Sequence, residues 1–189
     1  MERLARTVQR YLDFARPSPP GEGGDVRSVV AATLGLLARE AEGRGVRLVA
    51  EGEAAGTLEL GGNAACAPVA LRMGGEELKQ ALLNLIRNAL EALPGGGEVR
   101  VGWAARRRDV EIWIADDGPG MDATTLARVR RPFFTTRAQG TGLGLAIVER
   151  LARDAGGRLE IESGIGRGTV CKLRLPRVDS RTAPSREDS

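Results

Sequence analysis

Residues 131–145 read RPFFTTRAQGTGLGL, and the interpretation of the whole chain starts from this stretch. Two phenylalanines, two threonines and an arginine lead into a turn with glycines at 140, 142 and 144. A helix is predicted to begin at Leu145. Glycine lets the backbone approach a ligand closely, and a helix N-terminus presents free N–H donors and positive dipole charge. The stretch is therefore expected to hold an anion, with phosphate as the first candidate.

The spacing of these glycines excludes two common nucleotide-binding motifs. A P-loop needs Lys followed by Ser or Thr after its glycines, and the dinucleotide fingerprint follows a β-strand. Taken alone, the turn is equally compatible with a loop that merely tolerates glycine. Its interpretation therefore depends on the other motifs of the chain.

Composition limits the class of protein. The chain has 189 residues, which suffices for one domain with a hydrophobic core, and its 28% charged residues are ordinary for a soluble protein. The net charge is only +3, and aromatic residues do not alternate with the arginine clusters at 106–108 and 128–131. Nucleic-acid binding is therefore not expected.

The cysteines and the hydropathy of the chain limit the class of protein further. Cys66 and Cys171 lack CxxC spacing, and the chain contains no histidine. We therefore expect no zinc site and two free thiols in a reducing compartment. The sequence has no apolar run long enough to span a membrane and no signal peptide. The chain is expected to be cytoplasmic without direct membrane contact, and a membrane-anchored parent protein is compatible with this.

Hydrophobic periodicity predicts the order of the elements. A helix over 2–15 is followed by a proline and glycine linker at 17–24, and residues 177–189 form a polar tail that is expected to be disordered. The domain between them, 25–176, has helices from the N-cap Asp25 to about Glu42 and over 75–93, 122–130 and 145–155; strands are predicted over 45–51, 67–73, 98–104, 109–116, 158–163 and 168–175. This order predicts an α+β fold, a two-layer sandwich in which a mixed sheet carries its helices on one face.

The helix predicted over 75–93 carries the second motif, whose polar residues are Glu77, Asn84, Arg87, Asn88 and Glu91. Asn84 and Asn88 are one turn apart and share a flank of the helix. Asparagine is a poor helix former, so the pair needs a reason beyond propensity. Carboxamide oxygens suit Mg²⁺, which keeps several waters and binds phosphate oxygens. Two surface amides without a function are the alternative.

Two further motifs are glycine-rich turns. Asp116 ends an apolar strand and is followed by Gly118 and Gly120. A carboxylate there can accept a hydrogen bond from an exocyclic amine, and the glycines leave room for a ring. In the second turn, residues 164–169, the hydroxyl of Thr169 is a candidate for a polar network around Asp116. Each turn is, by itself, also explained as ordinary turn chemistry.

Together these segments resemble the N, G1, F, G2 and G3 boxes of the ATP-binding domain of sensor histidine kinases. That domain has the Bergerat (GHKL) fold, which type II topoisomerases, Hsp90 chaperones and MutL share. The resemblance covers residues 25–176 in the family's order and is closest to the nitrogen-regulation subfamily. Residues 1–16 resemble the C-terminal end of the dimerisation and phosphoacceptor hairpin of these kinases.

The resemblance implies a site for ATP and Mg²⁺. Asn88 would be the principal Mg²⁺ ligand, and Asn84 would lie toward the phosphates. Asp116 would accept the adenine amino group. Arg87 and Arg137 would neutralise phosphate charge, although an ordinary exposed cation explains either arginine equally well. The remaining implied residues shape the adenine pocket (Gly118, Gly120, Thr169), form the lid (Phe133, Phe134, Thr135, Thr136 with Arg137) or belong to the phosphate-binding turn (Gly140, Thr141, Gly142, Leu143, Gly144).

Three positions depart from the family pattern. Related ATPases carry a general-base glutamate where this chain has Asn84, and an amide cannot take a proton from water. Phosphoryl transfer to a partner nucleophile is therefore expected rather than efficient hydrolysis. Arg137 replaces a lysine, which keeps the charge but changes the geometry. Gly74 replaces a frequent aspartate and is expected to weaken the cap of the helix that follows.

The absence of histidine bears most directly on function. The family's phosphoacceptor histidine lies on the first helix of the hairpin, which this chain lacks, so autophosphorylation of this chain is not expected. We expect a monomeric catalytic domain of a two-component protein-histidine kinase, which passes the γ-phosphoryl group to a histidine-bearing dimerisation domain, with a response regulator downstream. The alternatives are an anti-sigma-type protein-serine kinase, which usually lacks the hairpin remnant, and a non-catalytic nucleotide-binding docking module.

Overall fold

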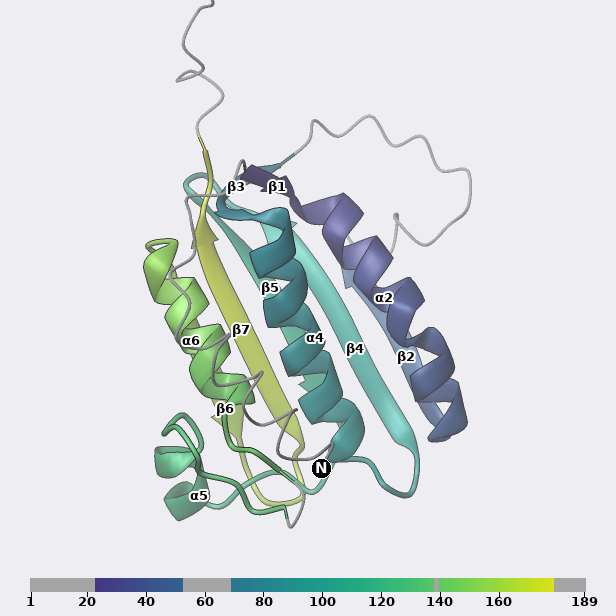
Figure 1. The fold of residues 1–189 in the computed structure, drawn as a ribbon. Coiled ribbons are helices and arrows are strands. Elements are labelled where there is room, and N and C mark those ends of the chain that lie inside the picture. Colours follow the sequence, from purple (N-terminus) through teal and green to yellow (C-terminus); the bar gives the residue numbers. More distant parts are fainter. Residues whose placement is uncertain (1–22, 53–68, 138–139, 179–189) are drawn as a thin grey trace, which may run out of the picture.

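The computed structural model describes residues 23–52, 69–137 and 140–178 (Figure 1). The helix expected over 2–15, the linker up to residue 22, and Cys66 lie outside the described residues. The described strands are β1 (Gly23–Asp25), β2 (Val46–Gly52), β3 (Ala70–Gly74), β4 (Gly97–Ala105), β5 (Asp109–Asp116), β6 (Arg158–Ser163) and β7 (Thr169–Pro176). The helices are α2 (Val26–Gly43), α4 (Gly75–Glu91), α5 (Ala123–Arg128) and α6 (Gly144–Asp154).

One five-stranded sheet forms the first layer, in the order β2-β4-β5-β7-β6. β2 runs parallel to β4, and the other neighbouring pairs are antiparallel. Helices α2, α4 and α6 lie side by side on one face of this sheet and form the second layer (Figure 1). The predicted α+β sandwich, with a mixed sheet and helices on one face, is confirmed.

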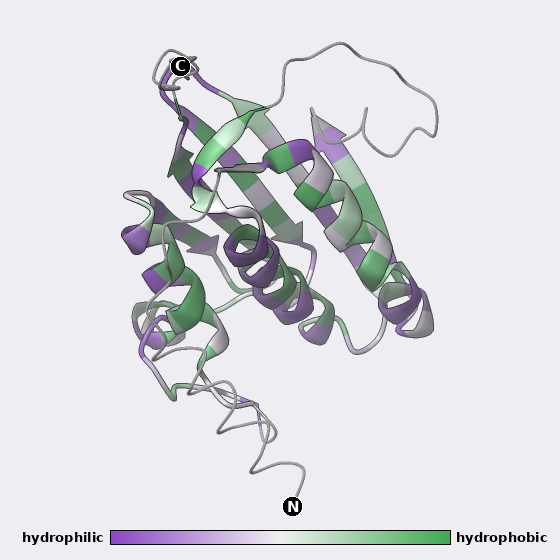
Figure 2. Cartoon of the chain, turned by 45° about the horizontal axis from the view of Figure 1, so that its top comes forward, coloured by the Kyte–Doolittle hydropathy of each residue, from purple (hydrophilic) through white to green (hydrophobic). Residues whose placement is uncertain are grey.

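Alternation along the strands determines which side chains meet the helices. Odd-numbered apolar residues of β4 and even-numbered apolar residues of β5 are buried beneath the helices. Figure 2 shows the hydrophobic residues on the sides of helices and strands that face each other. The opposite face of the sheet carries cross-strand ion pairs, such as Arg100 with Glu51 and Arg174 with Glu111. In the part of the chain that the structure describes, no helix covers that face, and no helix is long and apolar enough to cross a membrane.

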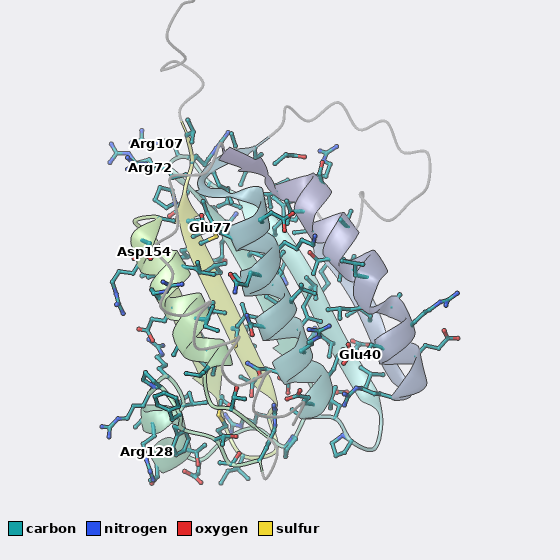
Figure 3. All side chains as sticks on the ribbon, in the orientation of Figure 1. Glu40, Arg72, Glu77, Arg107, Arg128 and Asp154 are labelled. Carbon is teal, nitrogen blue, oxygen red and sulfur yellow. The ribbon has the colours of Figure 1, made fainter. Side chains whose placement is uncertain are left out.

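The N-terminus of α2 has the cap that the sequence predicts, and the N-terminus of α4 is stabilised in a different way. The Asp25 side chain accepts the backbone N–H of Ser28 at 3.1 Å, which confirms Asp25 as the N-cap of α2. Gly74 precedes α4 and has no side chain to cap it. The side chain of Glu77, at the start of α4 in Figure 3, accepts the backbone N–H of Gly74 at 3.0 Å. Glu76 and Glu77 also place negative charge at the positive end of the helix dipole, which offsets the missing cap.

Two parts of the sequence interpretation are corrected by strand pairing. Residues 23–25 were assigned to the linker and the start of the domain, but they form β1, which pairs with β3 in a separate two-stranded sheet. The predicted disorder from residue 177 is wrong for residues 177 and 178. Arg177 forms a β-bridge with Leu71, and the Val178 N–H donates to the Ala70 carbonyl at 2.9 Å. Both pairings join segments far apart in the sequence, so local propensity does not reveal them.

Candidate functional site

A cavity of about 930 Å³ extends along α4, from Glu76 and Lys79 to the end of the domain where α4 and β5 end and α6 begins. Its volume is within the usual range for sites that hold a small molecule. Polar walls come from α4, from the turn after β5, from residues 134–137 and 140–142, and from the first turn of α6. The apolar part of the lining includes Ile114, Met121, Ile147, Ile161 and Cys171.

The two asparagines of α4 border this cavity beside the N-terminus of α6. The Asn84 side-chain nitrogen donates to the Gln80 carbonyl at 2.9 Å, which leaves its oxygen available. Gly144 begins α6 so close that a Cβ at this position would lie 3.3 Å from that oxygen and within 4 Å of the Asn88 amide. Amide oxygens, which suit a hard cation, and helix N–H groups, which suit an anion, therefore border the same space.

Asp116 lies at the end of β5 and lines the same cavity. Its carboxylate accepts the backbone N–H of Gly118 at 3.0 Å. Burial raises the pKa of Asp116, and hydrogen bonds from the backbones of Gly118 and Thr169 partly offset this rise. A partly desolvated carboxylate is a strong acceptor for an N–H group of a ligand.

The hydroxyl of Thr169 belongs to a network that the sequence did not reveal. Its oxygen lies 2.9 Å from the hydroxyl of Ser163, so Thr169 approaches Asp116 through its backbone rather than through its side chain. Ser163 also donates to the Gly168 carbonyl and accepts the N–H of Met121, both at 2.9 Å. This network fixes the turn after β5 to the hairpin between β6 and β7. A serine at a strand end carries no motif, so nothing in the sequence singles out Ser163.

The segment between α5 and α6 folds back on itself through one glycine. Phe133 has a φ of 65°, and its N–H donates to the Gly142 carbonyl at 2.9 Å. Gly142 has a φ of 67°, and a Cβ there would overlap the backbone of Phe133 and Phe134. Only glycine adopts this positive φ and leaves room for the neighbouring backbone without strain. Phe134 lines the cavity, and the Arg128 guanidinium lies 4.5 Å from its ring centroid (Arg128 is labelled on α5 in Figure 3).

The two candidate phosphate-binding arginines have different partners. The Arg87 Nε lies 3.4 Å from a carboxylate oxygen of Glu40 on α2, which is labelled in Figure 3. Arg137 forms an ion pair with Glu91, and its Nη2 donates to the Asn88 carbonyl at 2.9 Å. Arg137 is thus fixed to the last turn of α4, while Arg87 is directed toward α2.

Most residues singled out from the sequence meet at this cavity, and three of them do not line it. Gly118 lies behind Asp116, Leu143 is fully buried under the first turn of α6, and the Phe133 side chain is 63% exposed. The apolar lining was missed because its residues follow the same periodicity as the core. Residues of the prediction that do line the cavity are Asn84, Arg87, Asn88, Asp116, Gly120, Phe134, Thr135, Thr136, Arg137, Gly140, Thr141, Gly142, Gly144 and Thr169.

Comparison with known proteins shows what this arrangement resembles. Residues 74–179 match the family described as histidine kinase-, DNA gyrase B-, and HSP90-like ATPase. Sensor histidine kinase ZraS of Klebsiella oxytoca is 32% identical over 179 residues, which are 93% of this chain and 36% of ZraS. Sporulation kinase C of Bacillus subtilis (strain 168) is 40% identical over 100 residues, which are 53% of this chain and 23% of that kinase.

Solved structures show the same fold. Full-length ShkA, determined in complex with AMPPNP, has a TM-score of 0.76 at 24% identity, over 94% of this chain and 36% of ShkA. The mycobacterial sensor histidine kinase MprB has a TM-score of 0.65 at 25% identity, over 83% of this chain and 97% of that structure. The chain spans only 23% of sporulation kinase C and 36% of ZraS, so it corresponds to a part of these relatives.

The raised pKa of Asp116 predicts the effect of removing its charge on stability. The unfolded chain releases this proton near the ordinary pKa of 3.8 and the folded chain at a higher pH, so ionised Asp116 destabilises the empty domain above that window. Asp116→Asn keeps an oxygen for the Gly118 N–H and removes the charge. At pH 7 we expect an equal or higher Tm for the variant, and below the ordinary pKa we expect no gain.

Thermal unfolding followed by circular dichroism from pH 3 to 8 measures this difference. Asp122→Asn is the matched control, because hydrogen bonds from the Thr125 backbone lower the pKa of Asp122, the N-cap of α5. Its ionised form stabilises the fold, and this contribution is lost as the pH falls through the lowered pKa, so the control is expected to reduce the Tm at pH 7. A lower Tm for Asp116→Asn at pH 7 would contradict the prediction.

Proposed function

Because this chain belongs to the family of histidine kinase-, DNA gyrase B-, and HSP90-like ATPases, we propose that its cavity binds ATP with Mg²⁺ and serves phosphoryl transfer to histidine. The chain would be the catalytic domain of a sensor histidine kinase, like the relatives that it matches. One observation carries the proposal: Asp116, the Asn84 and Asn88 flank of α4, and the first turn of α6 border one cavity.

The two ends of the cavity offer different chemistry to the nucleotide. At the β5 end, Asp116 would accept the adenine amino group, and the apolar lining around Ile114 and Met121 would hold the ring. At the α6 end, the backbone N–H groups of Gly142, Leu143 and Gly144 would bind phosphate oxygens. Asn88, with Asn84 one turn away, would hold Mg²⁺, which neutralises phosphate charge when it is bound.

The same residues favour transfer of the phosphoryl group over hydrolysis. Asn84 stands where a glutamate base would be needed to activate water, and an amide cannot do this. Phosphoryl transfer depends mainly on positioning and electrostatic stabilisation, which the cavity residues can supply. The chain contains no histidine, so the acceptor would lie on a dimerisation domain outside it, and a response regulator would take the group from there. The motif from Phe133 to Thr136 supports assignment to the nitrogen-regulation subfamily. The proposed use of ATP supports a cytoplasmic location.

Binding of Mg²⁺ and ATP is expected to depend on Asp116 and Asn88. Loss of a hydrogen bond to a charged group predicts a 10- to 100-fold weaker affinity, as an order of magnitude, for Asp116→Asn. Asn88→Ala is expected to remove most of the difference between the affinities for ATP measured with and without Mg²⁺. Isothermal calorimetry measures both effects.

The matched control for this experiment is Asp109→Asn. It makes the same change at the other end of β5, away from the cavity, and is expected to leave the affinity for ATP unchanged. If Asp109→Asn weakens binding as much as Asp116→Asn does, Asp116 is not the adenine-binding residue. If the folded wild-type domain binds no ATP, the docking-module alternative replaces the proposal.

Phosphoryl transfer to histidine is expected when a purified histidine-bearing hairpin of a sensor kinase and γ-labelled ATP are added. The label should appear on the hairpin, be lost in acid and be absent with Asp116→Asn. An acid-stable label on serine would instead support the anti-sigma-type kinase. A folded domain that binds ATP but labels no hairpin would contradict the kinase assignment.

A further inference from the structure

The last turn of α4 contains an acidic residue where the helix disfavours one. Glu91 is the final residue of α4, and the last turn contains no basic residue. The C-terminal end of a helix carries partial negative charge and has carbonyl groups without partners inside the helix. A carboxylate at this position is slightly unfavourable, and a cation beside it offsets this.

Arg137 supplies that cation from the segment before α6. Its Nη1 pairs with the Glu91 carboxylate, and its Nη2 donates to the Asn88 carbonyl at 2.9 Å. The backbone of Arg137 is also fixed, because its N–H donates to the Thr135 hydroxyl at 3.1 Å and its carbonyl accepts the Gly140 N–H at 3.1 Å. The planar guanidinium can meet both partners at once, which an ammonium group on a flexible stem would do less well.

This arrangement is better suited to a ligand than to stability. The side chains of Arg137 and Glu91 are 38% and 42% exposed, and ion pairs that exposed contribute little to folding. Both residues line the cavity. A guanidinium has five N–H donors, and these two contacts leave others available to an anion. Arg87, by comparison, is paired with Glu40 on α2.

We propose that Glu91 is a positioning residue for nucleotide binding. It holds the Arg137 guanidinium at the wall of the cavity, on the turn of α4 that carries Asn88, so that the remaining N–H groups meet the phosphates. This inference rests on the proposed binding of ATP. Without Glu91, the long Arg137 side chain must be ordered when the nucleotide binds, and this cost weakens the affinity.

A double-mutant cycle tests whether Glu91 acts through Arg137. Calorimetry with Mg²⁺ and ATP, and separately with adenosine, compares the wild type, Glu91→Gln, Arg137→Ala and the double variant. We expect Glu91→Gln to weaken ATP binding by about 3- to 10-fold, the cost of ordering one side chain, and to leave adenosine binding unchanged. With Ala at position 137, the change at Glu91 should not weaken ATP binding.

The control is Glu160→Gln, which makes the same change on β6, where Glu160 pairs with Arg158 and Arg174 away from the cavity. It is expected to leave both affinities unchanged, and thermal unfolding confirms that each variant is folded. Tighter ATP binding by Glu91→Gln, or the same loss with and without Arg137, would overturn the role of Glu91. A folded wild type that binds no ATP would overturn the proposed function as well.

Discussion

The close contact between the first turn of α6 and the amide flank of α4 is the constraint on which the site depends. A Cβ at Gly144 would lie 3.3 Å from the Asn84 side-chain oxygen, so glycine lets the two helices approach here without displacing that amide. The same contact aims the free N–H groups of α6 at a space bordered by amide oxygens. The phosphate end of the proposed site therefore follows from how two helices pack on the sheet.

At the other end of the cavity, the positions of the site residues depend on the strands of the sheet. β5 places Asp116 at this end of the domain. There the register of β5 with β7 pairs Asp116 with Thr169. The Ser163 hydroxyl then fixes the turn after β5 to the last hairpin. Rigid elements thus hold the end of the cavity proposed for adenine, and residues 134–137 and 140–142 line the cavity from the side. Arg137 attaches these residues to the turn of α4 that carries Asn88.

Local patterns predicted most of the fold. The period of apolar residues placed α4 and its buried stripe of Leu78, Leu82 and Leu85, and Asp25 marked the start of α2. These signals lie within one element, where helix geometry alone sets the spacing. β1 and the pairing of residues 177 and 178 were missed, because their partners lie on β3 and their own residues have no strand signal.

The site, too, was predicted where the signal is local and missed where it depends on residues far apart in the sequence. The motifs identified the polar residues that meet at the cavity, because they mark one flank of α4, the end of β5 and the turn before α6. The ion pair between Arg137 and Glu91 joins positions 46 apart in the sequence, and the sequence alone does not show which acid Arg137 meets. Phe133 was assigned to the lid, and its side chain is exposed. Leu143 was assigned through its backbone, which its buried side chain leaves untested.

Mg²⁺ and ATP are proposed to occupy the cavity between α4, β5 and α6. The most direct test is a map of backbone amide chemical shifts by NMR as a non-hydrolysable ATP analogue and Mg²⁺ are added. Binding in the cavity is expected to give large shifts at Asp116 to Gly120, at Gly140 to Gly144 and in the last two turns of α4, with little change at the Arg106 to Arg108 turn at the opposite end of the sheet. Shifts concentrated at that turn or on the open face of the sheet would contradict it.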